Sequence, residues 1–261
     1  MIKLNLARNC LRYLIRVYGI GEIYLPYYSC NTLWHAVKKE DCNIKFYHIG
    51  SDFLPLKKFP DDAFILYINY FGMCGDNCRK LEGEYSNLIV DNTQAFYSEP
   101  MGLASFNSLR KFFLVQNGAY LYTERVSEEN FEQDKELFIP VTMRENYEKF
   151  LKNENILDKE NIKYIYPETE NFMKNFDFEK DKNVRLERFW EYHKIYNKYN
   201  SIKLVPTEKE IPYCYPLSTT DKNVQKEISD FGYPLLSLWG EIPKDFPEYE
   251  FLNNTVALPL R

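Results

Sequence analysis

The chain has 261 residues, a formal net charge of −5 at neutral pH and a hydrophobic content of 45%. That length and composition can bury a real core and suit one large or two modest domains. The acidic balance leaves no basic face to neutralise phosphates along a polymer, so the composition excludes a general nucleic-acid binder.

The sequence shows no targeting or membrane segment. Its start, residues 1–5, lacks the long apolar stretch of a signal peptide, and no apolar run is long enough for a transmembrane helix. The 6 cysteines do not form the dense pattern of a disulfide scaffold. Cys74 and Cys78 have CxxxC spacing, but a zinc site would need two more ligands. We therefore expect a cytoplasmic protein with no metal site and no membrane contact.

The first half of the chain alternates predicted helices with predicted strands. Leu11, Leu14 and Ile15 lie at helical spacing in the first helix. The predicted helices are 6–17 and 32–39, and the predicted strands are 22–25, 44–49, 63–69, 87–90 and 118–123. Strands that alternate with helices indicate βαβ units and a mostly parallel sheet.

The second half has a different character. Residues 127–183 are rich in Glu, Lys and Asn and contain few apolar runs. Helices are predicted at 184–199 and 221–230, the second ended by Phe231-Gly232, with an extended segment at 206–215 and a last strand at 255–259. This pattern predicts a large α/β domain over 1–150 and a smaller α+β domain over 151–261.

Polar residues follow several predicted strands of the first half. Asp91 ends the apolar run 88–90, Asn69-Tyr70-Phe71-Gly72 ends another strand, and the polar stretch 27–32 follows a third. In parallel sheets, ligands bind beyond the carboxyl ends of the strands. These strand ends therefore predict a binding site at one edge of the sheet, although structural turns also collect there.

Two residues of this stretch suggest a specific chemistry. Asp91 is either a turn-forming residue or the partner of a buried cation. Lys111 is either one half of a solvated Arg-Lys pair or an activated amine, whose pKa of roughly 10.4 would be lowered by burial or by Arg110. An acid for a ring nitrogen and an amine for an aldehyde are what pyridoxal phosphate requires.

Short motifs along most of the chain resemble the DegT/DnrJ/EryC1/StrS family of aminotransferases. They lie in order at 6–11, 25–30, 69–72, 91–94, 108–111, 117–119 and 258–260. The resemblance implies the PLP-transferase fold of type I, an α/β fold with a mostly parallel sheet flanked by helices and a smaller α+β C-terminal domain. The chain resembles an unusually short member of this family.

The resemblance also implies catalytic roles for Lys111 and Asp91. Lys111 would bind the aldehyde of pyridoxal 5′-phosphate covalently and move a proton at the amino carbon, while Asp91 would pair with the pyridine nitrogen. Gln94 falls where the family often has His, near the O3′ oxygen or the ring of the cofactor.

The phosphate of the cofactor would be held at the start of the first helix. Arg8 and Asn9 would offer backbone N–H groups there, where unpaired donors and the helix dipole favour an anion. Ser108 or Ser105 would add a hydroxyl, and the spacing leaves open which of them does so.

Three positions depart from the family pattern. Leu6 and Ala7 replace the usual Gly and Ser/Thr at the start of the first helix. The aromatic residue that stacks on the ring would fall near Cys30, which cannot stack; Trp34 could substitute for it or simply pack in the core. The phosphate and stacking positions are therefore altered, whereas the Asp91–Lys111 pair is retained.

The implied function is a PLP-dependent aminotransferase. It would move an amino group from an amino acid, glutamate in the first instance, to a nucleotide-linked keto-sugar in surface-polysaccharide or amino-sugar biosynthesis. The resemblance implies a homodimer whose active site draws on both subunits. Two alternatives remain: a shortened relative that binds PLP or a sugar nucleotide without transaminase activity, and a carbohydrate-modifying transferase without PLP.

Overall fold

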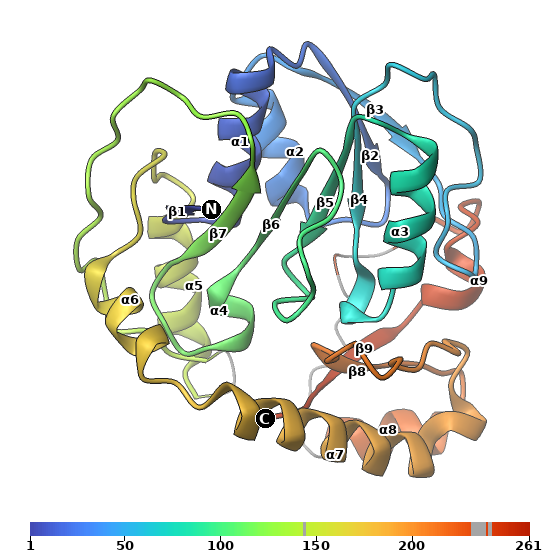
Figure 1. The fold of residues 1–261 in the computed structure, drawn as a ribbon. Coiled ribbons are helices and arrows are strands. Elements are labelled where there is room, and N and C mark those ends of the chain that lie inside the picture. The colour runs from blue at the N-terminus through green and yellow to red at the C-terminus, as the bar shows by residue number, and fades with distance from the viewer. Residues whose placement is uncertain (143–144, 231–238, 240–241) are drawn as a thin grey trace.

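The computed structural model describes residues 1–142, 145–230, 239 and 242–261. A sheet of 7 strands forms the centre of the molecule, in the order β1-β7-β6-β5-β4-β2-β3 (Figure 1). Its strands are β1 (Ile2–Leu4), β2 (Glu22–Pro26), β3 (Asn43–Tyr47), β4 (Ile65–Ile68), β5 (Leu88–Asn92), β6 (Ala104–Asn107) and β7 (Ala119–Thr123). β7 is antiparallel to both of its neighbours, and the remaining pairs are parallel.

Helices cover both faces of the sheet. α1 (Ala7–Tyr18) and α2 (Asn31–Lys38) lie behind it in Figure 1, and α3 (Gly75–Glu84) lies in front. The short helices η1 (Tyr70–Gly72) and α4 (Leu109–Phe112) follow β4 and β6. Every strand of the parallel core therefore leads into a turn or helix at the same edge, which is where ligands bind in such sheets.

The sequence of α1 explains both its packing and its end. Cys10, Leu11 and Leu14 are fully buried, so the helix presents an apolar face to the sheet. Gly19 ends the helix with a left-handed backbone, φ 65°, and its N–H donates to the carbonyl of Arg16. Leu6 stands at the N-cap, where no side chain accepts from the first N–H groups.

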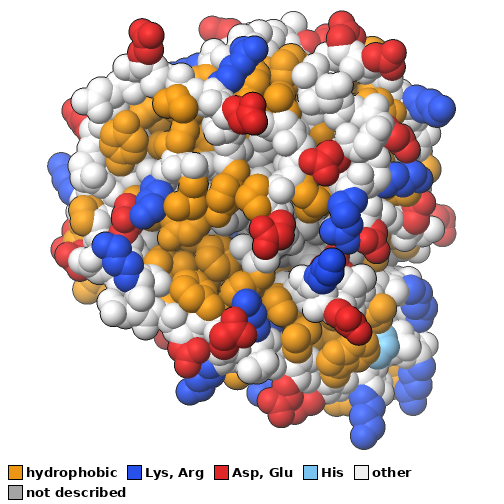
Figure 2. Space-filling view, viewed as in Figure 1, with side chains coloured by type: hydrophobic (Ala, Val, Ile, Leu, Met, Phe, Trp, Pro, Cys, Tyr) orange, Lys and Arg blue, Asp and Glu red, His pale blue; other side chains and the backbone are white. Residues whose placement is uncertain are grey.

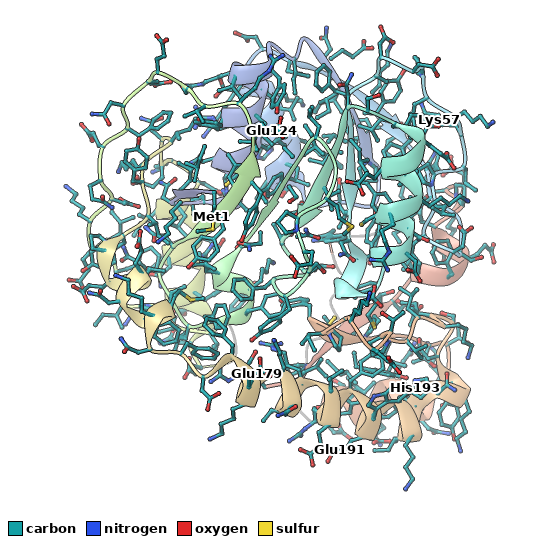
Figure 3. All side chains as sticks on the ribbon, viewed as in Figure 1. Met1, Lys57, Glu124, Glu179, Glu191 and His193 are labelled. Atoms are coloured by element: carbon teal, nitrogen blue, oxygen red, sulfur yellow. The ribbon has the colours of Figure 1, made fainter. Side chains whose placement is uncertain are left out.

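The part of the chain after β7 begins with α5 (Tyr147–Leu157) and α6 (Pro167–Lys174), which lie beside β7 and α4 in Figure 1. The elements from α7 onward lie mostly below the carboxyl ends of the parallel strands: α7 (Phe178–Tyr196), η2 (Asn197–Tyr199), β8 (Cys214–Ser218), α8 (Lys222–Asp230), α9 (Tyr249–Leu252) and β9 (Thr255–Pro259). β8 and β9 pair in antiparallel fashion. Side chains fill the space between the sheet and α7, along which Glu179 and His193 mark the early and late turns (Figure 3).

Two backbone contacts attach this C-terminal part to the strand ends. The N–H of Tyr213 donates to the carbonyl of Phe71 at 2.8 Å, and the N–H of Gly75 donates to the Glu210 carboxylate at 2.7 Å. The segment before β8 therefore lies directly against the turn after β4.

Most elements of the first half lie where the sequence predicts them, but several others were not predicted. β1, β6, α3, α5 and α6 are absent from the sequence-based expectation. β6 is only 4 residues long and carries Ser105 and Asn107, so it lacks the apolar run of its neighbours. The predicted cap at Phe231-Gly232 lies outside the described residues.

The domain boundary after residue 150 stays a prediction. Residues beyond it still pair with the large sheet, since the N–H of Ile165 donates to the carbonyl of Lys3 at 3.1 Å. None of the described helices is long and apolar enough to cross a membrane.

Candidate functional site

Asp91 is a buried carboxylate at the carboxyl end of β5. Its side chain is 2% exposed, and one oxygen accepts the N–H of Thr93 at 2.8 Å. Among the described residues, no Lys, Arg or His lies within ion-pair distance of it. Burial raises the pKa of Asp91 to about 6, against the lowering effect of the Thr93 bonds and of the Lys111 charge. The site thus holds a carboxylate whose charge is poorly compensated.

Lys111 lies on α4, which follows β6, the strand beside Asp91. Solvent reaches its side chain, although groups from several elements surround it: Tyr213 before β8, Cys30 at the start of α2 and Glu154 on α5. Its charge acts on Asp91, so the structure places the two predicted catalytic residues in one electrostatic environment.

The pKa of Lys111 differs from the sequence expectation. It is raised, chiefly by the Coulombic effect of Tyr213, while desolvation by the surrounding groups and the charge of Arg110 act in the lowering direction. The lowering effects that the sequence predicts are therefore present but are outweighed. Sequence reasoning missed Tyr213 because it lies 102 positions after Lys111.

A buried ion pair on α7 positions both Tyr213 and the helix of Lys111. Arg185 is 3% exposed, and its Nε donates to the Asp181 carboxylate at 2.7 Å. Its other nitrogens donate to the carbonyl of Phe112 at 3.2 Å and to that of Tyr213 at 3.3 Å. Arg185 therefore ties the residue after Lys111 to Tyr213. The only sequence signal was an acid and a base 4 residues apart on a helix.

Gln94 supports the turn after β4. Its side chain is 1% exposed, and its carbonyl oxygen accepts the N–H of Phe71 at 2.8 Å. Phe71 and Gly72 both have positive φ, 57° and 76°. A Cβ on Gly72 would come within 2.6 Å of the Gln94 backbone oxygen, so only glycine fits this turn. The Gln94 side chain thus stabilises the turn after β4, and its predicted contact with a cofactor stays a prediction.

The predicted phosphate site at the start of α1 is only partly available. The N–H of Asn9 donates to the carbonyl of Leu6 at 3.0 Å, which corrects the expectation that it is open to an anion. The Arg8 guanidinium forms an ion pair with Asp158. The phosphate would thus depend on fewer donors than the sequence predicts.

The register of β6 separates the two candidate serines. Ser105 pairs with Val90 while Phe106 pairs with Asp91, so the Ser105 side chain lies on the face opposite Asp91. This corrects the expectation that Ser105 could supply the hydroxyl for the phosphate. Its hydroxyl is buried without a partner among the described residues. Ser108, at the N-cap of α4 with no capping bond from its side chain, remains the candidate hydroxyl.

Trp34 is held by contacts within the chain. Its indole N–H donates to the Ser29 hydroxyl at 2.9 Å, and its ring packs edge-on against Phe46 at 5.1 Å between centroids. These contacts favour the core-packing alternative for Trp34. Cys30 accepts a contact from the Thr32 hydroxyl at 3.1 Å and contributes no ring.

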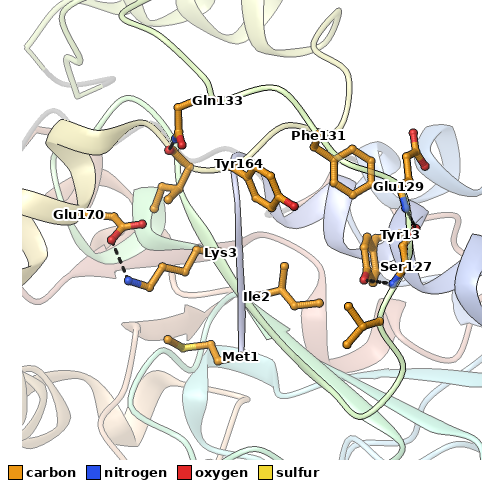
Figure 4. A pocket seen from close by; sticks show the side chains of 12 residues that line it. Met1, Ile2, Lys3, Tyr13, Ser127, Glu129, Phe131, Gln133, Tyr164 and Glu170 are labelled. Atoms are coloured by element: carbon orange, nitrogen blue, oxygen red, sulfur yellow. Dashed lines mark hydrogen bonds and ion pairs between the residues drawn. The ribbon is translucent and has the colours of Figure 1, made fainter.

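A pocket of about 420 Å³ lies away from this site, between β1 and the segment 126–133 (Figure 4). Lys3 and Glu170 form an ion pair of 2.8 Å on one side of it, and the Tyr13 hydroxyl accepts the N–H of Ser127 on the other. It contains none of the predicted site residues. The described residues also contain no group of three or more His, Cys, Asp or Glu that could hold a metal ion.

Hydrophobic side chains gather over β6, β7 and α4 on the face shown in Figure 2. Beneath this surface, Leu109, Phe112 and Phe113 are buried, and Phe96 and Phe178 pack partly buried against them. The exposed apolar side chains above this cluster are typical of an interaction face.

No family model and no curated protein matches the sequence. Solved structures do match it over nearly its whole length. A DegT DnrJ EryC1 StrS aminotransferase from Brucella abortus has a TM-score of 0.60 at 12% identity, covering 99% of this chain and 80% of that one. DesV from S. venezuelae has a TM-score of 0.62 at 14% identity, with coverages of 99% and 78%. The PLP form of Spr1654 from Streptococcus pneumoniae, described as a sugar aminotransferase, has 0.59 at 14%, with coverages of 100% and 81%.

The fold is that of the DegT/DnrJ/EryC1/StrS aminotransferases. The type I fold predicted from the sequence is thereby confirmed, with a mostly parallel sheet flanked by helices. At these identities the likeness to DegT/DnrJ/EryC1/StrS structures establishes the fold, and the chemistry has to be argued from the site itself.

Proposed function

We propose that this chain is a PLP-dependent aminotransferase that acts on nucleotide-linked keto-sugars. The observation that carries the proposal is the buried Asp91 carboxylate, which has no cation of its own among the described residues and lies within the field of Lys111. A buried charge without a partner is costly, so its retention favours a cationic ligand at this position.

The ring end of pyridoxal 5′-phosphate fits these residues. Its protonated ring nitrogen is the cation that Asp91 lacks, and such a partner would return the Asp91 pKa toward its ordinary range. When bound, the cofactor supplies an aldehyde and an electron-withdrawing ring that stabilises negative charge at the amino carbon. The PLP and PMP forms of Spr1654 support this choice of cofactor.

The chain's own residues then have distinct roles. Asp91 would hold the ring end of the cofactor through its nitrogen, and Lys111 is the amine that would hold its aldehyde end and carry a proton to and from the amino carbon. Tyr213 and Arg185 position Lys111. Ser108 and the N–H of Arg8 are the remaining candidates for the phosphate.

The names of the structural neighbours support a sugar as the acceptor, since several of them are described as sugar aminotransferases. Within this proposal the sugar is a nucleotide-linked keto-sugar and the donor is an amino acid, glutamate in the first instance. We also propose a cytoplasmic homodimer engaged in surface-polysaccharide or amino-sugar biosynthesis. The apolar surface over β6, β7 and α4 supports a second copy as partner, and light scattering of the purified protein measures the oligomeric state.

A visible absorption spectrum of the protein with PLP, recorded before and after glutamate, tests the proposal. We expect a visible band that glutamate shifts, and borohydride should fix the cofactor on Lys111, located by peptide mass spectrometry. If Lys111→Ala gives the same band and the same glutamate shift, the assignment of Lys111 fails.

A second candidate function is a binding relative without transamination. The N–H of Asn9 already donates to the carbonyl of Leu6, so fewer donors would remain for the phosphate and the cofactor would bind less tightly. This observation favours the second candidate. A band that forms with PLP but that no amino acid converts would support this candidate. Comparison with pyridoxal, which lacks the phosphate, measures how much the phosphate contributes to binding.

A further inference from the structure

A second pocket, of about 350 Å³, lies between α1 and α2. Arg8 and Arg12 line it from α1, Lys38 and Lys39 line it from the end of α2, and Asp158 lines it from the residue after α5. The arginines are one helical turn apart and so share a side of α1. The helix repeat places Cys10, whose thiol lies in the field of Asp91, about 200° around the helix from Arg8. Arg8 and Asn9, the predicted phosphate positions at the start of α1, also line this pocket, whereas the thiol in the field of Asp91 lies on the other side of the helix.

The charges of this pocket are only partly balanced. Arg8 pairs with Asp158, and Arg12 Nε pairs with Glu40 at 2.6 Å. The ammonium of Lys39 donates to the backbone carbonyl of Asp158 at 3.0 Å. A carbonyl carries no full charge, so this bond does not neutralise the ammonium.

Lys38 is exposed and forms no ion pair with any described residue. His35, the remaining titratable group of the lining, is exposed at the rim and adds no negative charge. Two ammonium groups thus remain uncompensated beside two partly enclosed guanidinium groups, in a protein whose net charge is −5.

We propose that this pocket binds a small ligand through a phosphate or pyrophosphate group. A dianion would match the charges of Lys38 and Lys39, and lysine binds phosphate as a point charge. The volume, about 350 Å³, is at the small end of ligand pockets and suits a phosphate-bearing small molecule. A nucleic acid is not favoured, because the basic groups gather around one pocket in an acidic protein rather than along a stripe. The proposal goes beyond the aminotransferase function, since the charges it rests on belong to Lys38 and Lys39, which take no part in the proposed cofactor site.

Calorimetric titration with inorganic pyrophosphate and inorganic phosphate, at constant ionic strength set by chloride, tests this site. The test variant is Lys38→Gln with Lys39→Gln, both exposed. The control is Lys222→Gln with Lys226→Gln, two exposed lysines of α8 whose removal changes the net charge equally. Urea unfolding of both variants checks that each remains folded.

We expect saturable pyrophosphate binding to the wild type that weakens about tenfold or more in the Lys38/Lys39 variant. The α8 variant should stay within about twofold of the wild type, since its charges lie outside the pocket. Equal weakening in both variants would show an effect of net charge alone and would overturn the proposal. Binding that does not saturate in the wild type would overturn it as well.

Discussion

Asp91 and Asp181 are both buried carboxylates, but their surroundings differ. Asp181 is 3% exposed, and it accepts Arg185 Nε at 2.7 Å and the Tyr97 hydroxyl at 2.7 Å, with Arg261 at 3.3 Å from its other oxygen. Asp91 is 2% exposed and has the N–H of Thr93 as its hydrogen-bond donor. One carboxylate is matched by cations of the chain itself, and the other is not.

The difference separates a structural charge from one that is available to a ligand. A buried charge needs a partner, and the Asp181–Arg185 pair supplies one while joining α7 to α4 and to Tyr213. At Asp91, burial instead raises the pKa of the carboxyl to about 6. The fold therefore maintains an unmatched carboxylate next to Lys111, as a site for a cationic ring would require.

Removal of Lys111 should give the largest effect on activity. We expect Lys111→Ala to lower amino transfer by about 10³-fold or more, because the only amine beside Asp91 in the described site is lost. Its side chain is exposed, so the free energy of unfolding should change by less than about 0.5 kcal/mol. Transfer assays and urea unfolding measure the two quantities.

Lys152→Ala is the matched control, since Lys152 is an exposed lysine of α5 away from Asp91. It should leave both quantities unchanged. A Lys111→Ala protein that retains full transfer, or one that is strongly destabilised, would contradict the view that Lys111 serves the chemistry and that the Asp181–Arg185 pair serves stability.

Removal of the Asp181 charge should give the largest effect on stability. Asp181→Asn leaves Arg185 buried without its carboxylate, and we expect a loss of about 3–5 kcal/mol in the free energy of unfolding, measured in urea. Replacing both residues, with Asp181→Asn and Arg185→Met, should recover part of that loss because no buried charge remains. If the double variant is as unstable as the single one, the pair is not coupled.

The sequence predicted the parts of the site that have local signals. Asp91 was found because it ends an apolar strand, and Lys111 because it lies in an ordered set of motifs. Tyr213 has no such signal, and Asp181 and Arg185 have only their spacing of 4 residues on a helix. Their contacts with α4 join segments far apart in the sequence, 73 positions for Arg185 and Phe112. Such pairs depend on tertiary packing, which a single sequence does not reveal.

The orientation of Ser105 shows a second limit. Moving the register of β6 by one residue would bring Ser105 to the face of Asp91 and remove Phe106 from it. Strand register depends on cross-strand packing, so the sequence left both serines open. The strand itself was not predicted because it is 4 residues long and half polar.

Asp91→Asn should change the free energy of unfolding less than Asp181→Asn does, and in the opposite direction. A carboxyl whose pKa is raised on folding binds its proton more tightly in the native state, so its contribution to stability is full below pH 3.8 and is lost as the pH rises through about 6. That shift corresponds to about 3 kcal/mol at most, and Asp91→Asn should therefore stabilise the cofactor-free protein by about 1–3 kcal/mol at pH 8.

Urea unfolding of Asp91→Asn at pH 8 and at pH 3.5 checks this sign. Near pH 3.5 the two proteins should unfold alike, because Asp91 is then protonated. The same variant should bind PLP more weakly, since it cannot hold the ring nitrogen's proton. Destabilisation at pH 8, as expected for Asp181→Asn, would show that Asp91 already has a charge partner within the chain.

The smallest effect is expected for Tyr213, which links the Asp181–Arg185 pair to Lys111. Arg185 donates to the Tyr213 carbonyl, and the Tyr213 phenol acts on the pKa of Lys111. Tyr213→Phe removes the hydroxyl whose Coulombic effect raises the pKa of Lys111, so the pKa of Lys111 should fall and the pH dependence of PLP binding should move to lower pH. Turnover should change by less than about tenfold, since Lys111 itself is retained. Tyr120→Phe on β7 is the control and should leave that pH dependence in place. An unshifted profile in Tyr213→Phe would mean that Arg185 positions Tyr213 for packing alone.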